Sequence, residues 1–256
     1  MRSTIILIGA DKGGVGKTTL SRALLDFLAR KNVPVRAFDT EHPGGTLKRF
    51  HPGLTEIIDF TNVADQMKVL DTLDTANVRV TLVDLRAGNL SVALDTFDRI
   101  GALEAARNGQ FDIGLFHVLG PAIASLEEIG EISKYIGGID YIIARDFINE
   151  TNFFEWDQKT HKKYFAKMHA ANAIDVPRLS EMAYEQVDLA GVTFDEFIDN
   201  KGVDGEPSNF SFVLRGYVRK WRNDLEKELE RLKLLKGLVS GRPSAAAAER
   251  VRKASS

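Results

Sequence analysis

The 256-residue sequence contains no cysteine. That absence excludes disulfide bonds, thiolate zinc sites and cysteine-ligated iron–sulfur clusters. Long hydrophobic runs are missing too: no apolar stretch approaches the roughly 20 residues that span a bilayer, and residues 1–3 lead into a predicted strand without a signal-peptide pattern. We therefore expect a cytoplasmic protein, long enough for one large α/β domain with a substantial core.

Net negative charge is also small, at −2, but it conceals an uneven distribution. Residues 208–256 contain 12 Lys and Arg against 5 Asp and Glu, whereas residues 1–207 contain 22 against 31. The C-terminal segment therefore carries +7 and the remainder −9. Because net charge affects association more than folding, we expect an anionic partner to bind the C-terminal segment.

A glycine-rich segment, GADKGGVGKTT at residues 9–19, follows the apolar run of residues 4–8. Its glycines let backbone N–H groups point inward, and a helix predicted from Lys17 adds its positive N-terminal end. The spacing matches the phosphate-binding pattern Gly-x4-Gly-Lys-Ser/Thr, with Asp11 at the first glycine position. Lys17 is expected to contact the β- and γ-phosphates of ATP, and the Thr18 hydroxyl to bind Mg²⁺. The predicted nucleotide-binding residues of this loop are Gly13, Gly14, Val15, Gly16, Lys17, Thr18 and Thr19.

A second lysine, Lys12, lies five residues before Lys17. The resulting pattern, Lys-Gly-Gly-x-Gly-Lys-Thr-Thr, resembles the deviant Walker A motif of the ParA/MinD superfamily of dimerising ATPases, and most closely its ParA-like partition and positioning members. The resemblance implies a doubly wound, mostly parallel α/β sheet flanked by helices. It also implies a homodimer in the ATP-bound state, in which Lys12 contacts the nucleotide of the partner subunit.

The loop after a second predicted strand begins with Asp39, at the sheet edge where open α/β sheets bind ligands. The resemblance identifies this loop as switch I, where the superfamily usually has Asp-x-Asp and the second aspartate helps to position the attacking water. Glu41 stands at that position, and its extra methylene moves the carboxylate by roughly 1.5 Å, so we expect slow hydrolysis. Asp39 and Glu41 are thus candidate catalytic residues beside Lys12 and Lys17; a loop cap and a solvated charge are the alternatives.

Residues 78–88 predict a β-branched strand that ends at Asp84, in the manner of a Walker B motif. Asp84 is expected to hold Mg²⁺ through its water shell, and Gly88 to let the backbone turn toward the γ-phosphate. The superfamily usually has Asp-x-Pro-Ala-Gly here, whereas this chain has Arg86 in place of the proline. Arg86 is either a contact to phosphate or partner, or an exposed charge.

Helices are predicted over 62–74 and 122–135, and strands over 111–119 and 140–145. In the superfamily the loop after the last of these strands carries an asparagine that recognises adenine, and Asn149 and Asn152 both fit that place. Residues 153–170 interleave aromatic and basic side chains, a pattern that favours a surface helix over nucleic-acid binding. Neither His42 nor His51 has the spacing of a metal ligand.

The sequence predicts an ATPase domain over 1–207, a basic amphipathic helix over 208–239 that ends near Gly237, and a mobile tail over 240–256. This helix could close the domain, bind a partner or lie on a membrane. Its apolar positions follow spacings of 3 and 4, and its basic positions are candidate contacts to DNA phosphates. Those candidate DNA contacts are Arg215, Arg219, Lys220 and Arg222.

The function that the resemblance implies is an ATP·Mg²⁺-dependent dimerising switch that hydrolyses ATP slowly and binds DNA non-specifically. Its role would be to partition or position a plasmid, chromosome or other cargo, or to assist conjugative transfer, with a stimulating partner protein and with association with the nucleoid. Three alternatives stay open: a MinD-like membrane-cycling regulator, a nucleotide-binding adaptor with little turnover, and a ligase resembling dethiobiotin synthetase. The sequence lacks a short basic amphipathic tip, which disfavours the first, and Lys12 disfavours the third.

Overall fold

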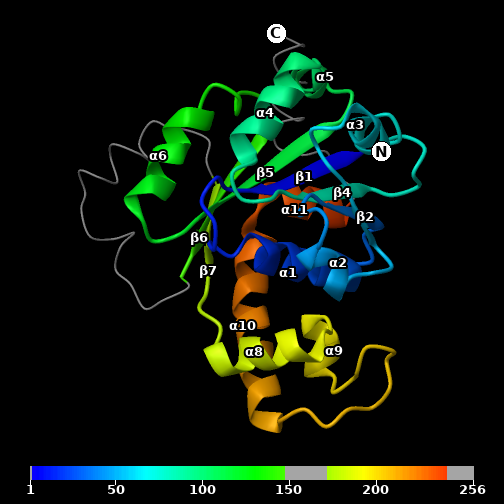
Figure 1. Ribbon diagram of the computed structural model, residues 1–256, viewed down its shortest axis with the longest axis vertical. Helices are drawn as coiled ribbons and strands as arrows, with labels where there is room; N and C mark the ends of the chain where they lie inside the picture. The colour runs from blue at the N-terminus through cyan, green and yellow to red at the C-terminus, as the bar shows by residue number, and fades with distance from the viewer. Residues whose placement is uncertain (1, 148–171, 241–256) are drawn as a thin grey trace.

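The computed structural model describes residues 2–147 and 172–240 (Figure 1). Within them, seven strands form one parallel sheet in the order β3-β2-β4-β1-β5-β6-β7. This arrangement confirms the doubly wound α/β fold expected from the sequence. The strands are β1 (Thr4–Gly9), β2 (Val35–Asp39), β3 (Thr55–Ile57), β4 (Val80–Asp84), β5 (Asp112–Leu119), β6 (Asp140–Asp146) and β7 (Asn172–Val176).

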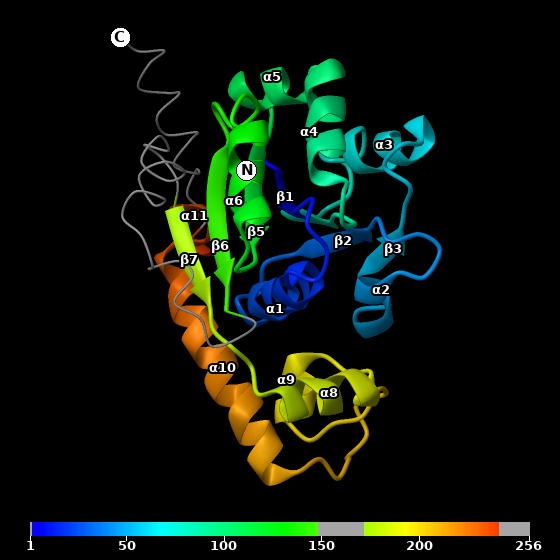
Figure 2. The ribbon, with the colours of Figure 1, turned by 60° about the vertical axis from the view of Figure 1, so that its left-hand side comes forward.

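Helices cover both faces of the sheet, and Figures 1 and 2 show the resulting three layers. On one face lie α1 (Lys17–Arg30), α2 (Thr46–Phe50), α8 (Glu181–Ala190), α9 (Phe194–Ile198), α10 (Phe212–Arg231) and α11 (Lys233–Ser240). On the other face lie α3 (Val63–Leu70), α4 (Leu90–Arg99), α5 (Ala102–Arg107) and α6 (Ile123–Ile132). None of the helices in the described ranges is long and apolar enough to cross a membrane.

The central strand β1 shows why the sheet needs both helical layers. All six of its residues are buried, and its side chains alternate between two separate hydrophobic cores. Ile6 and Ile8 pack into the core beneath α1 and α10, whereas Ile5 and Leu7 pack into the core beneath α4 and α6. A strand that is apolar on both faces is typical of a parallel sheet covered on both sides.

The topology places a binding site at the carboxyl end of β1. This strand pairs with β4 on one side and with β5 on the other, so the chain winds outward from it in two directions. Loops that leave neighbouring strands at such a point diverge and open a crevice for a ligand. The glycine-rich segment connects β1 directly to α1 at this point.

The C-terminal region differs from the single helix expected over 208–239. Leu232 adopts an extended backbone conformation and ends α10, and the separate helix α11 continues through Gly237 to Ser240. No glycine or proline marks the break, and the spacing of apolar residues continues through it unchanged. The sequence therefore gives no sign that one helix ends and another begins here. The expected mobile tail at 240–256 lies outside the described residues, apart from Ser240 at the end of α11.

Helix α10 packs on the rest of the fold along four apolar positions. The side chains of Val218, Trp221, Leu225 and Leu229 are each at most 4 % exposed and belong to the same core as α1. Ion pairs reinforce this contact, because Arg30 at the end of α1 binds Glu226 at 3.0 Å. The segment is therefore an integral layer of the described structure.

Candidate nucleotide-binding site

The loop between β1 and α1 has the backbone shape that its glycines allow. Gly14 and Gly16 have φ angles of 70° and 87°, in the left-handed region that side chains disfavour. Gly16 occupies the N-cap position of α1, so it brings no side chain to cover the N–H groups of the first turn. A Cβ atom at Gly16 would also lie 1.7 Å from Asp146 Oδ2. Glycine is therefore required at this position on two grounds.

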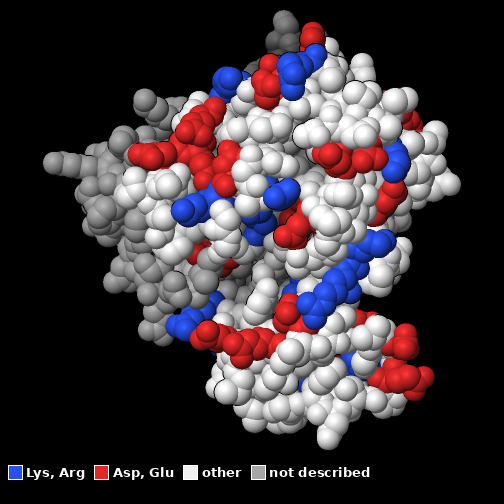
Figure 3. Space-filling model, in the orientation of Figure 1, with Lys and Arg blue, Asp and Glu red and all other residues white. Residues whose placement is uncertain are grey.

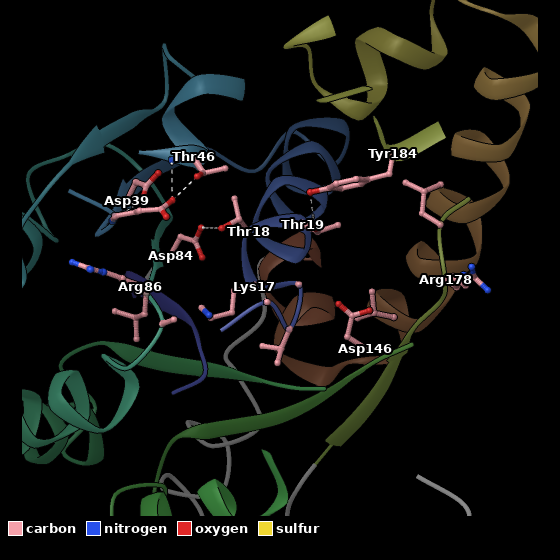
Figure 4. A pocket seen from close by; sticks show the side chains of 18 of the residues that line it. Lys17, Thr18, Thr19, Asp39, Thr46, Asp84, Arg86, Asp146, Arg178 and Tyr184 are labelled. Atoms are coloured by element: carbon pink, nitrogen blue, oxygen red, sulfur yellow. Dashed lines mark hydrogen bonds between the residues drawn. The ribbon is translucent and has the colours of Figure 1, made fainter. Parts of the chain in front are cut away.

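This loop borders a cavity of about 520 Å³, a volume typical of small-molecule sites. Figure 4 shows side chains from the ends of several strands converging on it. Of the residues predicted from the sequence, the cavity is lined by Gly14, Val15, Gly16, Lys17, Thr18, Thr19, Asp39, Glu41 and Asp84. The predicted residues Lys12, Gly13 and Gly88 are not part of the lining.

The Lys17 side chain lies beneath the loop and is mostly buried, with 8 % of the residue exposed. Its Nζ donates a hydrogen bond to the Lys12 carbonyl oxygen at 3.2 Å. Burial lowers the pKa of Lys17, and nearby carboxylates, with Asp84 the strongest, partly offset that effect. The negative charge of an incoming phosphate would stabilise the protonated, buried ammonium group further.

Thr18 and Asp84 form the part of the site that fits Mg²⁺. The Thr18 hydroxyl donates to Asp84 Oδ2 at 2.8 Å (Figure 4), while Asp84 Oδ1 is buried without a hydrogen bond within the described residues. Burial raises the pKa of Asp84 to about 7, and Asp39 on the neighbouring strand adds to the shift. An unpartnered buried carboxylate oxygen beside a threonine hydroxyl is a donor set that suits this ion, whose charge would neutralise that of bound phosphates.

The same ranges contain no group of three or more His, Cys, Asp and Glu side chains that could hold a metal by themselves. Mg²⁺ is compatible with so few protein ligands, because it keeps several waters and shares the oxygens of a bound phosphate. His42 is exposed and His51 is buried elsewhere, beside Asp26. Neither histidine reaches the cavity lining.

The Asp39 carboxylate organises the loop that follows it. Asp39 Oδ2 accepts from the backbone N–H groups of Leu47 and Lys48 at the start of α2, at 2.7 and 3.2 Å. Its Oδ1 accepts from the N–H of Glu41 at 2.9 Å. The Glu41 side chain in turn accepts from the hydroxyl and the N–H of Thr46 (Figure 4). Both carboxylates line the cavity while holding their own loop.

Asp11, at the first glycine position of the motif, connects the loop to the segment after β4. Its carboxylate accepts from the N–H of Leu90 at 2.8 Å and from the hydroxyl and N–H of Ser91, at the start of α4. Its backbone carbonyl accepts from the N–H of Gly88 at 3.0 Å. The aspartate side chain, which a glycine would lack, therefore ties the start of α4 to the phosphate-binding loop.

The far wall of the cavity consists of residues that sequence reasoning did not identify. It contains Asp146 at the end of β6, Val176 at the end of β7 and the three residues that follow it, together with Tyr184 and Trp221. Tyr184 accepts from the Thr19 hydroxyl at 3.4 Å, and Trp221 Nε1 donates to the Pro177 carbonyl at 2.7 Å. Burial raises the pKa of Asp146 to about 7. No local motif marks these residues, because the fold brings them together from distant segments.

The remaining residues singled out from the sequence fall into three groups. Asn149 and Asn152, like the aromatic and basic segment 153–170, fall outside the described residues. The Arg86 side chain lines the cavity and is exposed. The candidate DNA contacts bind groups of their own chain: Arg215 and Arg219 the Ile198 carbonyl, Lys220 the carboxylate of Asp224, and Arg222 that of Asp195.

A parallel sheet whose central strand leads through such a loop into a helix, with Lys17, Thr18 and Asp84 around one cavity, defines a P-loop nucleotide-binding protein. A family profile, the CobQ/CobB/MinD/ParA nucleotide binding domain, matches residues 6–240. The chain belongs to this family, which confirms the resemblance to the ParA/MinD superfamily of P-loop ATPases. No curated protein sequence matches the chain significantly.

Solved structures of this superfamily share the fold. A ParA family ATPase from Chlorobium tepidum aligns with a TM-score of 0.52 at 12% identity, over 87% of this chain and 98% of the other. The cell division protein MinD from Aquifex aeolicus aligns with a TM-score of 0.52 at 15% identity, over 88% and 97%. MinD from Pyrococcus horikoshii, complexed with Mg-ADP, also scores 0.52 at 15% identity, over 89% and 97%.

Proposed function

We propose that this protein is an ATP-dependent dimerising switch that hydrolyses ATP slowly, holds DNA non-specifically and partitions or positions a cargo. The observation that carries the proposal is the contrast between the two lysines of the loop. Lys17 is buried against the cavity, whereas Lys12 is exposed and outside the lining. An exposed lysine at the edge of a phosphate site has the reach to contact a nucleotide held by a second copy of the chain.

Slow hydrolysis is supported by the position of the loop carboxylates. Thr46 holds Glu41 through Oε2, and both Asp39 oxygens accept backbone N–H groups, so both carboxylates already hold their own loop. Thr18 and Asp84 would hold Mg²⁺ on the ATP phosphates. We infer that the γ-phosphate of ATP reorders residues 39–45 and 84–90, and that a partner protein accelerates turnover.

DNA binding is the part of the proposal with the most direct test. Figure 3 shows basic and acidic side chains intermingled on the face of Figure 1, where no continuous basic surface is seen. We propose that a DNA site forms when two subunits combine their basic side chains, which makes binding dependent on ATP. The candidates remain Arg215, Arg219, Lys220 and Arg222, once released from their present partners.

The experiment measures binding of non-specific duplex DNA to the purified protein with ATP, ADP or no nucleotide, at two salt concentrations. Lys12→Ala is the test variant and Lys201→Ala, an exposed lysine outside the basic C-terminal segment, is the matched control. We expect salt-sensitive binding in ATP that only Lys12→Ala loses, because phosphate contacts weaken steeply with salt. ATP binding without DNA binding in any state would contradict the proposal.

A MinD-like membrane cycle is the second candidate, since the two MinD structures match the fold as well as the ParA structure does. Vesicles containing anionic lipid, added in place of DNA under the same three nucleotide conditions, distinguish the two functions. ATP-dependent sedimentation with vesicles, without DNA binding, would favour the membrane cycle. We expect no such sedimentation, because the acidic residues Glu226, Glu228 and Glu230 of α10 oppose anionic lipid.

A further inference from the structure

A carboxylate from the opposite side of the sheet holds the start of the phosphate-binding loop. Glu128 on α6 accepts the backbone N–H of Asp11 on Oε2 at 2.9 Å and the N–H of Lys12 on Oε1 at 2.8 Å. Glu128 is 7 % exposed, so these are sheltered, charge-assisted bonds, which are about twice as strong as neutral ones. Each carboxylate oxygen thus binds one of two successive peptide groups.

Two buried side chains fix the orientation of Glu128 in turn. His117 on β5 is fully buried, with Nε2 3.2 Å from Glu128 Oε2 and Nδ1 2.8 Å from the Tyr141 hydroxyl on β6. Burial raises the pKa of Tyr141, which keeps its hydroxyl protonated. The Glu128 carboxylate can only accept, so Nε2 carries the proton that is donated to it, and Nδ1 of the neutral imidazole accepts from the tyrosine hydroxyl. This assignment gives each bond of the chain one donor and one acceptor.

The peptide group between Asp11 and Lys12, which Glu128 holds, and the peptide group that follows it position the rest of the site. The Lys12 carbonyl accepts from Lys17 Nζ at 3.2 Å, so its orientation helps to set the position of the ammonium group that meets the phosphates. The Asp11 carbonyl accepts from Gly88 at 3.0 Å and thereby fixes the turn after β4. Displacement of these peptides would move both sides of the phosphate site at once.

We propose that Glu128 is a positioning residue for nucleotide binding, oriented by His117 and Tyr141, which holds the loop in its phosphate-binding shape before the nucleotide arrives. A preformed cradle binds more tightly because less ordering is left for the binding step. This inference rests on nucleotide binding by the proposed function, but not on its dimerisation, hydrolysis or DNA binding.

The decisive comparison is Glu128→Gln against Glu127→Gln, the same change at the neighbouring exposed position of α6. A glutamine can accept from one of the two N–H groups only, and its NH₂ group opposes the other. We expect the Kd for Mg-ADP, measured by calorimetry, to rise about tenfold in Glu128→Gln and to stay unchanged in Glu127→Gln. Tyr141→Phe removes one hydroxyl and should raise the Kd about threefold while the fold is retained.

The melting temperature of each nucleotide-free variant separates positioning from simple support. A lowered melting temperature with an unchanged Kd in both Glu128→Gln and Tyr141→Phe would overturn the inference and leave Glu128 as a structural bridge. An equal rise of the Kd in Glu127→Gln and Glu128→Gln would overturn the inference as well. If the wild-type protein itself does not bind Mg-ADP, the proposed function fails first. If the wild-type protein binds Mg-ADP but no DNA, only the DNA-binding part of the proposed function fails, and the inference about Glu128 is unaffected.

Discussion

Asp26, Asp84 and Asp146 are buried aspartates whose pKa values are raised, mainly by burial, to about 8, 7 and 7. A raised acid pKa means that the folded protein holds the proton more tightly than the unfolded chain does. Stability from such a group is greatest below the unfolded pKa near 4 and is lost as the pH rises toward the folded value. The last two face the nucleotide cavity, whereas Asp26 lies beneath α9.

Asp26 offers the clearest test of this effect at a single residue. Its Oδ2 accepts from the Phe194 N–H at 3.0 Å, a bond that an asparagine oxygen can keep. His51, 3.7 Å away, has a pKa lowered to about 4 by burial and by Arg22, so it is neutral and supplies no countercharge at neutral pH. Asp26→Asn should therefore be more stable than the wild type at pH 8, by about 2–4 kcal/mol, and equal to it near pH 4.

Denaturant unfolding at pH 4, 6 and 8 measures this difference. Asp74→Asn, at an exposed position, is the control and should follow the wild-type curve at every pH. Parallel curves for Asp26→Asn and the wild type would show that Asp26 is ionised in the folded protein over this range.

Single residues of the site were predictable where a contiguous motif contains them. Lys17, Thr18 and Asp84 meet at the cavity because a glycine-rich turn and the end of the adjacent strand must lie side by side in a parallel sheet. Glu128 was not predictable, since it reaches the loop from 116 residues away in the chain and no local pattern distinguishes it from Glu127. The carboxylate of Asp11 was likewise seen only as a departure from the motif.

At the scale of elements, helix α10 shows how an amphipathic pattern translates into packing. Its charged side chains are largely paired: Arg222 binds Asp195, and Lys31 at the end of α1 binds Glu226 and Glu230. These pairs are partly exposed and contribute little each. The apolar stripe against α8, α9 and β7 therefore supplies most of the attachment.

Leu225→Ala tests whether α10 is part of the folding unit. Leu225 is 1 % exposed, so truncation should reduce the free energy of unfolding by about 2–5 kcal/mol. For a chain of this size that corresponds to a fall in melting temperature of roughly 5–15 °C. Tyr217→Ala, at a position of the same helix that is 53 % exposed, should change it by less than about 2 °C. Equal small effects would mean that α10 is not part of the folding unit.

The periodicity of apolar residues predicted most helices and strands, because the burial of one face of an element determines where its apolar residues stand. The helix expected from Lys17 is α1, and the predicted strands after it are β2, β4, β5 and β6. The separation of α10 from α11 was missed, since an extended Leu232 with a buried side chain leaves the apolar spacing intact. Which helix covers which strand depends on contacts between residues far apart in the sequence, and periodicity does not encode these contacts.

At the scale of the whole molecule, the cavity draws its lining from segments between Gly14 and Trp221. A ligand in this cavity would contact the loops after β1, β2, β4, β6 and β7 together. Its binding would therefore stabilise most of the sheet at once. A ligand that binds only the folded state stabilises it by about 2.7 kcal/mol when present at a hundredfold excess over its Kd. Nucleotide should therefore raise the melting temperature of the whole chain in one cooperative transition.

For Mg-ADP at that excess, we expect the wild-type melting temperature to rise by roughly 5–10 °C in differential scanning calorimetry. Lys17→Ala should lose nearly all of this rise, because the ammonium group that meets the phosphates is gone. Without nucleotide the variant should melt close to the wild type, since burial of an ammonium group, shown by the lowered pKa of Lys17, offsets the packing of its side chain. Lys48→Ala, which removes a bond to the Thr55 carbonyl at 2.7 Å outside the cavity, should retain the rise. A full shift in Lys17→Ala would place nucleotide binding elsewhere on the molecule.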